Sequence, residues 1–132
     1  MAIFIIMNTT RHLKTTVEEH LANKTNAIVE LFTTIRNEIN KFENIDQRVV
    51  DPYIGYYLKN GKDDPLFVEL HILRSRIVLH LRKVDYKNHG ALVVSEKPDS
   101  HRWTLNKLVN VSNKSELTYA ISLIEQSYRD VS

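Results

Sequence analysis

The chain has 132 residues, of which 42% are hydrophobic and 26% charged, with a formal net charge of +2 and no cysteine. These values fit a single soluble globular domain and exclude disordered chains, disulfide scaffolds and thiolate zinc sites. The lack of cysteine also fits a reducing cytoplasm, where we expect the protein to reside. Residues 1–132 are expected to form one domain, with 1–15 as an N-terminal strand or arm and 16–132 as its core.

The N-terminal segment is apolar from Met1 to Met7, and this run ends at Asn8. It lacks a basic region and is far shorter than the ~20 residues that a membrane-spanning helix needs. We therefore expect a strand or a packing strip and no membrane association. If this strip pairs edge to edge with a second copy, the chain is a homodimer.

Three helices are predicted from caps and periodicity. Thr16 and Glu19 have the spacing of a capping box, which starts a short helix that runs through Leu21. Asn113 and Glu116 have the same spacing before a C-terminal helix. Between them lies an amphipathic helix with apolar residues at three- and four-residue steps, namely Ile28, Leu31, Phe32, Ile35, Ile39 and Phe42.

The centre of the chain predicts a β-hairpin over residues 66–82. A two-residue turn at Arg74-Ser75 gives one aliphatic face and one polar, cation-rich face. The aliphatic pairs are Ile72 with Ile77, Leu70 with Leu79 and Val68 with Leu81; the other pairs are His71 with Val78, Glu69 with His80 and Phe67 with Arg82.

Further strands are predicted on both sides of this hairpin. Residues 51–59 are aromatic and β-branched, and Gly55 within them suggests a close approach by a neighbouring helix. Residues 43–46 indicate a connection, 91–94 a possible short strand, and 103–111 a last strand. The fold class is therefore α+β, with an antiparallel sheet of about four to five strands around a central hairpin. We expect the long N-terminal helix and the C-terminal helix to pack on one face of it.

Several segments resemble domain of unknown function family 5655. The likeness is carried, over about residues 18–128, by Glu19-His20-Leu21, Val29-Glu30-Leu31-Phe32 with Ile35 and Ile39, Tyr53-Ile54-Gly55-Tyr56, Phe67-Val68 with the strand from Arg76 to Arg82, and Leu117 with Leu123-Ile124-Glu125-Gln126-Ser127-Tyr128. The chain departs from the family pattern at Tyr57, where members typically have Lys, and at residues 100–103, which lack the glycines of a Gly-His-Trp-Gly turn.

The resemblance implies an accessory domain near nucleic-acid processing and not a catalytic unit. Members of the family often follow endonuclease-like domains, some of them linked to restriction. Many members are labelled putative or predicted transport proteins, a name that implies no mechanism. The family pattern also marks the turn at His101 and Trp103, together with Tyr53, as a possible functional turn.

The histidines allow a metal or an acid–base site. His71, His80 and Glu69 share the polar face of the hairpin and could bind a divalent metal if their tips converged. A cross-strand Glu69–His80 pair is the simpler interpretation, so we predict no metal and no cofactor. A small-ligand or metal-dependent enzyme using His20 and His101 is a further alternative, but no nucleophile elbow, phosphate loop or zinc-helix motif supports catalysis.

Nucleic-acid binding has a basis in the cations around the hairpin and the last strand. The candidate contacts are Arg74, Arg76, Arg82, Lys83, Arg102 and Lys107, and Tyr53, Tyr57 and Trp103 could provide stacking surfaces. We therefore predict a non-enzymatic accessory domain that binds nucleic acid or a nucleic-acid-acting protein. A protein–protein assembly module is the alternative.

Overall fold

A computed structural model describes residues 13–97 and 104–132 of the chain. In these ranges the elements are, in order, α2 (Val17–Leu21), α3 (Asn26–Ile39), β1 (Ile45–Val49), β2 (Ile54–Leu58), β3 (Leu66–Ile72), β4 (Ile77–Leu81), β5 (Ser95–Glu96), β6 (Lys107–Val111), the 3-10 turn η2 (Lys114–Glu116) and α4 (Leu117–Val131). The strand or arm predicted for Met1 to Met7 lies outside the described residues.

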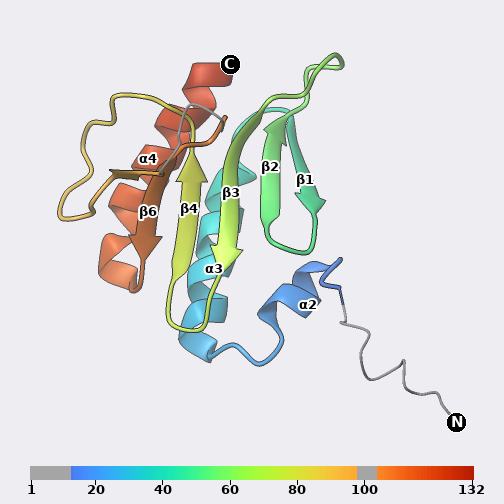
Figure 1. The fold of residues 1–132 in the computed structure, drawn as a ribbon, viewed down its shortest axis with the longest axis vertical. Coiled ribbons are helices and arrows are strands. Elements are labelled where there is room, and N and C mark those ends of the chain that lie inside the picture. The colour runs from blue at the N-terminus through green and yellow to red at the C-terminus, as the bar shows by residue number, and fades with distance from the viewer. Residues whose placement is uncertain (1–12, 98–103) are drawn as a thin grey trace, which may run out of the picture.

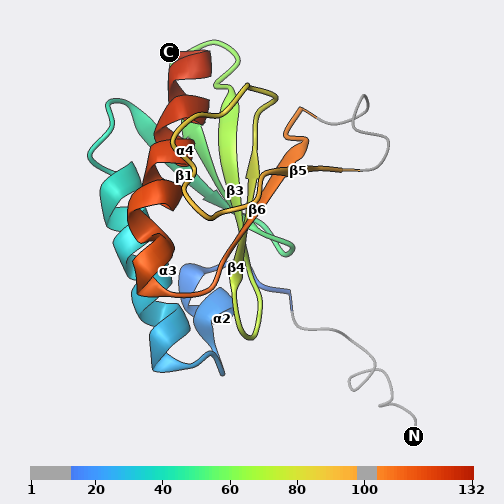
Figure 2. The ribbon, with the colours of Figure 1, turned by 90° about the vertical axis from the view of Figure 1, so that its left-hand side faces the viewer.

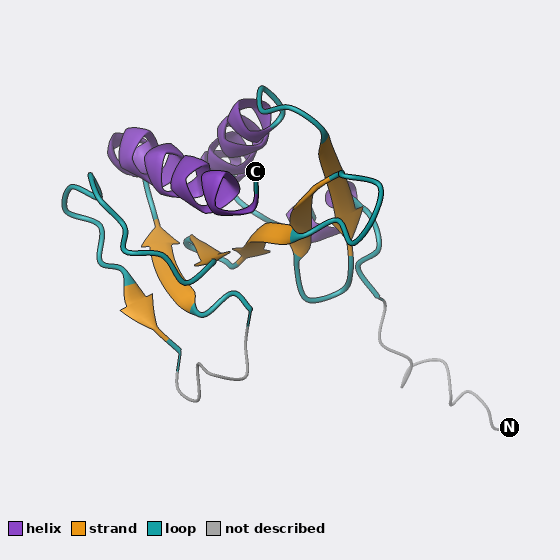
Figure 3. Ribbon diagram, turned by 90° about the horizontal axis from the view of Figure 1, so that it is seen from above, coloured by secondary structure: helices purple, strands orange, loops and turns teal. Residues whose placement is uncertain are grey.

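The strands form one antiparallel sheet in the order β1-β2-β3-β4-β6-β5 (Figure 1). Helices α3 and α4 lie together on one face of this sheet, and no described helix covers the middle of the other face (Figures 2 and 3). Helix α2 lies near the β1–β2 turn, where the His20 ring contacts the Val50 carbonyl oxygen at 2.8 Å. This arrangement confirms the α+β class and the packing of both long helices on one face.

The β3–β4 hairpin has the predicted register. Ile72 pairs with Ile77, Leu70 with Leu79, and Val68 with Leu81, and Glu69 faces His80 on the other side. The aliphatic members of these pairs are buried against α3 and α4. The helix-covered face therefore holds the hydrophobic core, because alternation along β3 and β4 directs every second side chain toward the helices.

The helix starts also match the prediction. The Glu19 backbone N–H donates to Thr16 Oγ1 at 3.1 Å, and Glu19 Oε1 accepts from the Thr16 backbone N–H at 3.0 Å. Asn113 and Glu116 form the second capping box, which precedes a 3-10 turn before α4. The predicted long helix ends at Ile39, so Phe42 lies beyond it.

Two strand predictions were wrong and a third was right in part. Strand β1 occupies Ile45–Val49, partly where we expected a connection, because an edge strand with polar residues on both faces shows no clear alternation. Residues 91–94 form no strand, and the short β5 follows them. The last strand begins at Lys107, so only its second half is paired as predicted.

No helix in the described parts of the chain has the length and apolarity needed to cross a membrane.

Candidate functional site

The exposed face of the sheet is the side opposite α3 and α4 (Figure 2). The register places Glu69 and His71 of β3 on this face together with His80 of β4. We call these three residues the Glu–His–His cluster. Each of them has only a small exposed side-chain fraction, between 13% and 22%.

The three polar groups of the cluster converge. One nitrogen or oxygen from each residue lies within 4.8 Å of the others. The His71 Nε2 atom lies 2.9 Å from Glu69 Oε1, and His80 Nδ1 lies 3.7 Å from the same oxygen. The expected cross-strand pair of Glu69 and His80 is present at 3.7 Å. His71 makes the shorter contact with the same oxygen, because residues 69 and 71 project from the same side of one strand.

His80 is the residue in the cluster whose polar atom lacks a hydrogen bond. Its Nδ1 atom is buried and has no hydrogen-bonding partner. Burial, together with the charges of His71 and Lys97, lowers the pKa of His80 to about 3. His80 is therefore a neutral imidazole at pH 7, with an unused polar atom directed at the Glu69 carboxylate.

A row of rings crosses the exposed face. The Tyr53 ring lies 5.4 Å from that of His71, and the His71 and His80 rings are stacked at 3.8 Å with 16° between their planes. Beside the row, the Arg48 guanidinium lies 4.1 Å from the centre of the Tyr57 ring. Aromatic, imidazole and guanidinium planes thus lie together on one side of the sheet.

Gly55 makes room for this row. A Cβ atom at position 55 would lie 3.2 Å from side-chain atoms of Tyr53, Tyr57 and Leu66. The neighbours of Gly55 are therefore tyrosine and leucine side chains on the exposed face, and the close helix that we expected there is absent from the described residues near it. Any larger residue would press on the rings.

A pocket of about 520 Å³ opens over the Glu–His–His cluster. Besides the cluster it is lined by Pro52, Tyr53, Leu66, Lys97, Thr104 and Leu105. Tyr53 is the one member of the predicted functional turn among the described residues, and it lies in this pocket. His101 and Trp103 lie outside the described residues, as does Arg102.

Three cations of the described chain lie near one another at one end of the molecule. Burial lowers the pKa of Lys24, and the positive charges of Lys14 and Arg74 lower it further. We call Lys14, Lys24 and Arg74 the basic rim; Figure 1 shows that the N-terminal end of α3 and the β3–β4 turn lie at the same end of the molecule. Arg76 follows this turn, and its Nε donates to Asn110 Oδ1 at 2.8 Å. The sequence did not indicate Lys14 and Lys24 as candidate contacts, because only the packing of α2 brings them close to the hairpin.

The other predicted cations lie elsewhere. The Arg82 side chain pairs with Asp130 of α4 at 2.8 Å and also donates to the Leu66 carbonyl oxygen at 3.0 Å. Lys107 pairs with Glu96 at 2.9 Å. Arg82 and Lys107 are thus engaged within the chain, at the end of the hairpin opposite Arg74 and Arg76.

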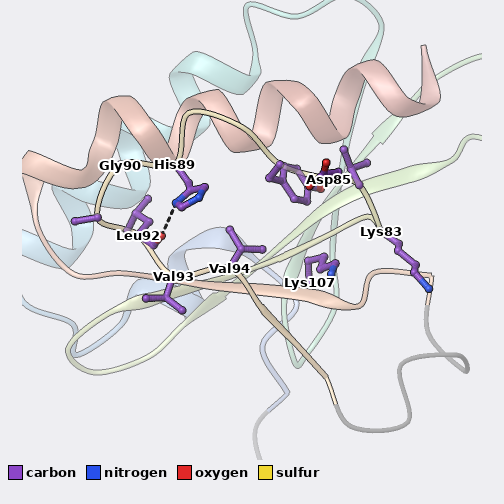
Figure 4. A pocket seen from close by; sticks show the side chains of 11 residues that line it. Lys83, Asp85, His89, Gly90, Leu92, Val93, Val94 and Lys107 are labelled. Carbon is purple, nitrogen blue, oxygen red and sulfur yellow. Dashed lines mark hydrogen bonds between the residues drawn. The ribbon is translucent and has the colours of Figure 1, made fainter.

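A larger pocket of about 800 Å³ lies beside the loop of residues 83–94. Lys83 and Lys107 line it, together with the apolar side chains of Leu92, Val93 and Val94 (Figure 4). The His89 ring here is satisfied, since its Nδ1 contacts the Leu92 carbonyl oxygen at 3.0 Å. The smaller pocket over the cluster is the better candidate site, because the unused polar atom lies there.

The enzyme alternative through His20 gains no support from the geometry. His20 is buried, with a 3% exposed fraction. Its Nε2 atom lies 2.8 Å from the Val50 carbonyl oxygen. The ring therefore ties α2 to the end of β1.

Fold and site together define a class of α+β domains, in which helices cover one face of an antiparallel sheet and a polar, ring-lined pocket lies on the other. The chain belongs to the family described as domain of unknown function (DUF5655), which it matches over residues 17–131. This match confirms the resemblance found in the sequence. No curated protein and no solved structure matched the chain.

Proposed function

We propose that this domain is a non-enzymatic, cytoplasmic accessory module that binds single-stranded nucleic acid on the exposed face of its sheet. The observation that carries the proposal is the row of rings from Tyr53 through His71 to His80, with the Arg48–Tyr57 stack beside it. Association of the family with nucleic-acid processing, which the sequence resemblance implies, points the same way.

Stacking is the first contribution to binding. Unpaired bases stack on tyrosine, histidine and guanidinium planes, at about 1–3 kcal/mol per base. Tyr53 and Tyr57 are partly exposed, and the guanidinium of Arg48 presents a further plane above Tyr57. Bases in a duplex are already stacked on one another, so we expect a duplex to bind more weakly than a single strand.

Electrostatics is the second contribution. Arg48 pairs with Asp46 and Asp64, each at 2.8 Å, so its charge is largely compensated. The phosphate contacts are therefore assigned to the basic rim of Lys14, Lys24 and Arg74, with Arg76 next to it. Binding through a few such contacts is of modest affinity and sensitive to salt.

The salt dependence of binding tests this assignment. We expect fluorescence anisotropy to detect binding of a labelled single-stranded oligonucleotide that weakens with salt. Replacing the basic rim (Lys14→Gln, Lys24→Gln, Arg74→Gln) removes three charges and should reduce the slope of log K against log salt by about 2, at about 0.7 per phosphate contact.

The matched control removes three exposed cations from elsewhere on the chain, with Lys41→Gln, Lys87→Gln and Arg129→Gln. It changes the net charge equally and should keep the wild-type slope. Absent binding, salt-independent binding or an equal loss of slope in both variants would refute the proposal.

A further inference from the structure

The Glu–His–His cluster combines donor atoms that suit a metal ion. Two imidazoles and one carboxylate approach one another from β3 and β4, and the antiparallel register holds them in place. Imidazole nitrogens favour zinc-like transition metals, whereas Mg²⁺ and Ca²⁺ prefer sites made of oxygen alone.

The separations between these donor atoms fit a shared ion. With metal–ligand bonds of about 2.0–2.1 Å, neighbouring donors of a tetrahedral site lie about 3.3 Å apart. Glu69 Oε1 lies 2.9 Å from His71 Nε2 and 3.7 Å from His80 Nδ1, so the two separations bracket this value. The remaining pair of donor atoms lies within 4.8 Å. The His71 and His80 rings are stacked with 16° between their planes, so the rings must rotate out of this stack to direct both nitrogens at one ion.

The unused nitrogen of His80 is a second, independent observation. A buried polar atom without a partner costs about 1–3 kcal/mol, so its presence calls for an explanation. His80 Nδ1 is such an atom, and it lies 3.7 Å from Glu69 Oε1. An imidazole nitrogen that carries no proton is the form in which histidine binds a metal.

We propose that Glu69, His71 and His80 bind one divalent transition-metal ion of the Zn²⁺ type. Glu69 supplies one carboxylate oxygen, His71 its Nε2 atom and His80 its Nδ1 atom. The proton that His71 Nε2 shares with Glu69 moves to Nδ1 of the same ring when the ion binds. This inference goes beyond nucleic-acid binding and does not depend on it.

The pocket leaves a fourth coordination position open. It extends from the cluster past Tyr53, Lys97 and Thr104, so a water molecule or an external ligand has room beside the ion. The positive charge of Lys97 opposes the cation and favours an anionic ligand in that position. We therefore expect weaker binding than in a closed site with four protein ligands.

Zn²⁺ titration of the full chain, treated first with a chelator, tests the proposal. Isothermal calorimetry should detect one bound Zn²⁺ per chain and a rise in melting temperature. Combining His71→Gln with His80→Gln should weaken binding about a hundredfold or more, and Glu69→Gln should weaken it about tenfold. The control His89→Gln changes a histidine that contacts the Leu92 carbonyl instead, and it should bind as the wild type does. No Zn²⁺ binding to the wild type, or equal binding by the double variant, would overturn the proposal.

A measurement on the unmodified protein covers the case in which the variants do not fold. In ¹H–¹⁵N spectra, Zn²⁺ should shift the ring nitrogens of His71 and His80. Shifts confined to other histidines would place the ion elsewhere and overturn the proposal. The basic-rim variant retains the Glu–His–His cluster, so it should bind Zn²⁺ as the wild type does. Unchanged oligonucleotide binding in that variant, with Zn²⁺ binding intact, would refute the proposed function and leave the metal site standing.

Discussion

At the scale of single residues, His80 combines a buried position with a polar atom that has no hydrogen-bonding partner. It sits in the middle of β4, opposite Glu69 and stacked on His71. Burial keeps its ring neutral by lowering its pKa to about 3. An unfolded chain has no such burial, so the ring there takes up a proton near its ordinary pKa of 6.5.

The folded protein should therefore lose stability as the pH falls. The unfolded state binds the His80 proton below about pH 6.5 and the folded state only near pH 3, so the loss develops between these values and is absent at higher pH. In chelator, the free energy of unfolding should fall between pH 7 and pH 5, with His80 contributing about 2 kcal/mol. Urea unfolding should show a smaller fall for His80→Gln than for the wild type or the His89→Gln control. Identical falls in all three proteins would contradict the assignment.

The substitution Gly55→Ala gives a second prediction at the scale of single residues. Gly55→Ala places a methyl group 3.2 Å from the Tyr53 and Tyr57 side chains, which must shift to accept it. We expect weaker oligonucleotide binding with little change in secondary structure, measured by anisotropy and circular dichroism. Gly61→Ala is unsuitable as a control, because Gly61 has a positive φ of 81°. Wild-type binding by Gly55→Ala would argue against the ring row as the contact surface.

At the scale of elements, helix α4 is tied to the central hairpin by one buried serine. Ser127 Oγ accepts the Arg82 backbone N–H at 3.1 Å and donates to the Phe67 carbonyl oxygen. It thereby satisfies two backbone groups where the β3–β4 ladder ends. The predicted pairing of Phe67 with Arg82 is not among the ladder pairs, and the Arg82 amide bonds to the helix instead.

Ser127→Ala should therefore destabilise the protein. The substitution leaves the Arg82 N–H and the Phe67 carbonyl without their partner, at a cost of about 1–3 kcal/mol. Urea unfolding measures this change. Ser122→Ala is the matched control on the same helix, where the side chain is partly exposed, and it should change stability by about 0.5 kcal/mol or less. Equal effects of the two substitutions would contradict the role of Ser127.

The elements differ in how far the sequence predicted them. The β3–β4 register followed from aliphatic alternation around a two-residue turn, and the helix starts followed from capping residues, because both signals are local. Strand β1 was missed because its central residues Asp46, Gln47 and Arg48 are all polar, so it lacks apolar alternation.

The candidate site was predicted less completely. Strand register alone places Glu69, His71 and His80 on one face, as expected, but the choice of His71 as the partner of Glu69 depends on side-chain rotamers. Long-range packing brings Asp130 into an ion pair with Arg82 and places Lys24 close enough to Arg74 for their charges to interact, and no local pattern in the sequence indicates either arrangement.

At the scale of the whole molecule, the two faces of the sheet carry different kinds of side chain. The helix-covered face holds the hydrophobic core, and the exposed face carries the rings and the Glu–His–His cluster. The basic rim lies at one end of the molecule. Packing of the hydrophobic core does not require a row of rings on a sheet face that no described helix covers. The central claim is therefore that this face is the binding surface.

The most direct test of this claim compares ring substitutions on opposite faces. Tyr53→Ala with Tyr57→Ala removes two rings from the exposed face, and Tyr119→Ala removes a partly exposed ring from α4. Anisotropy with a labelled single-stranded oligonucleotide should show binding about tenfold or more weaker for the double variant, since each stacked base contributes about 1–3 kcal/mol. Tyr119→Ala should bind as the wild type does. Unchanged binding by the double variant, or an equal loss in Tyr119→Ala, would contradict the claim.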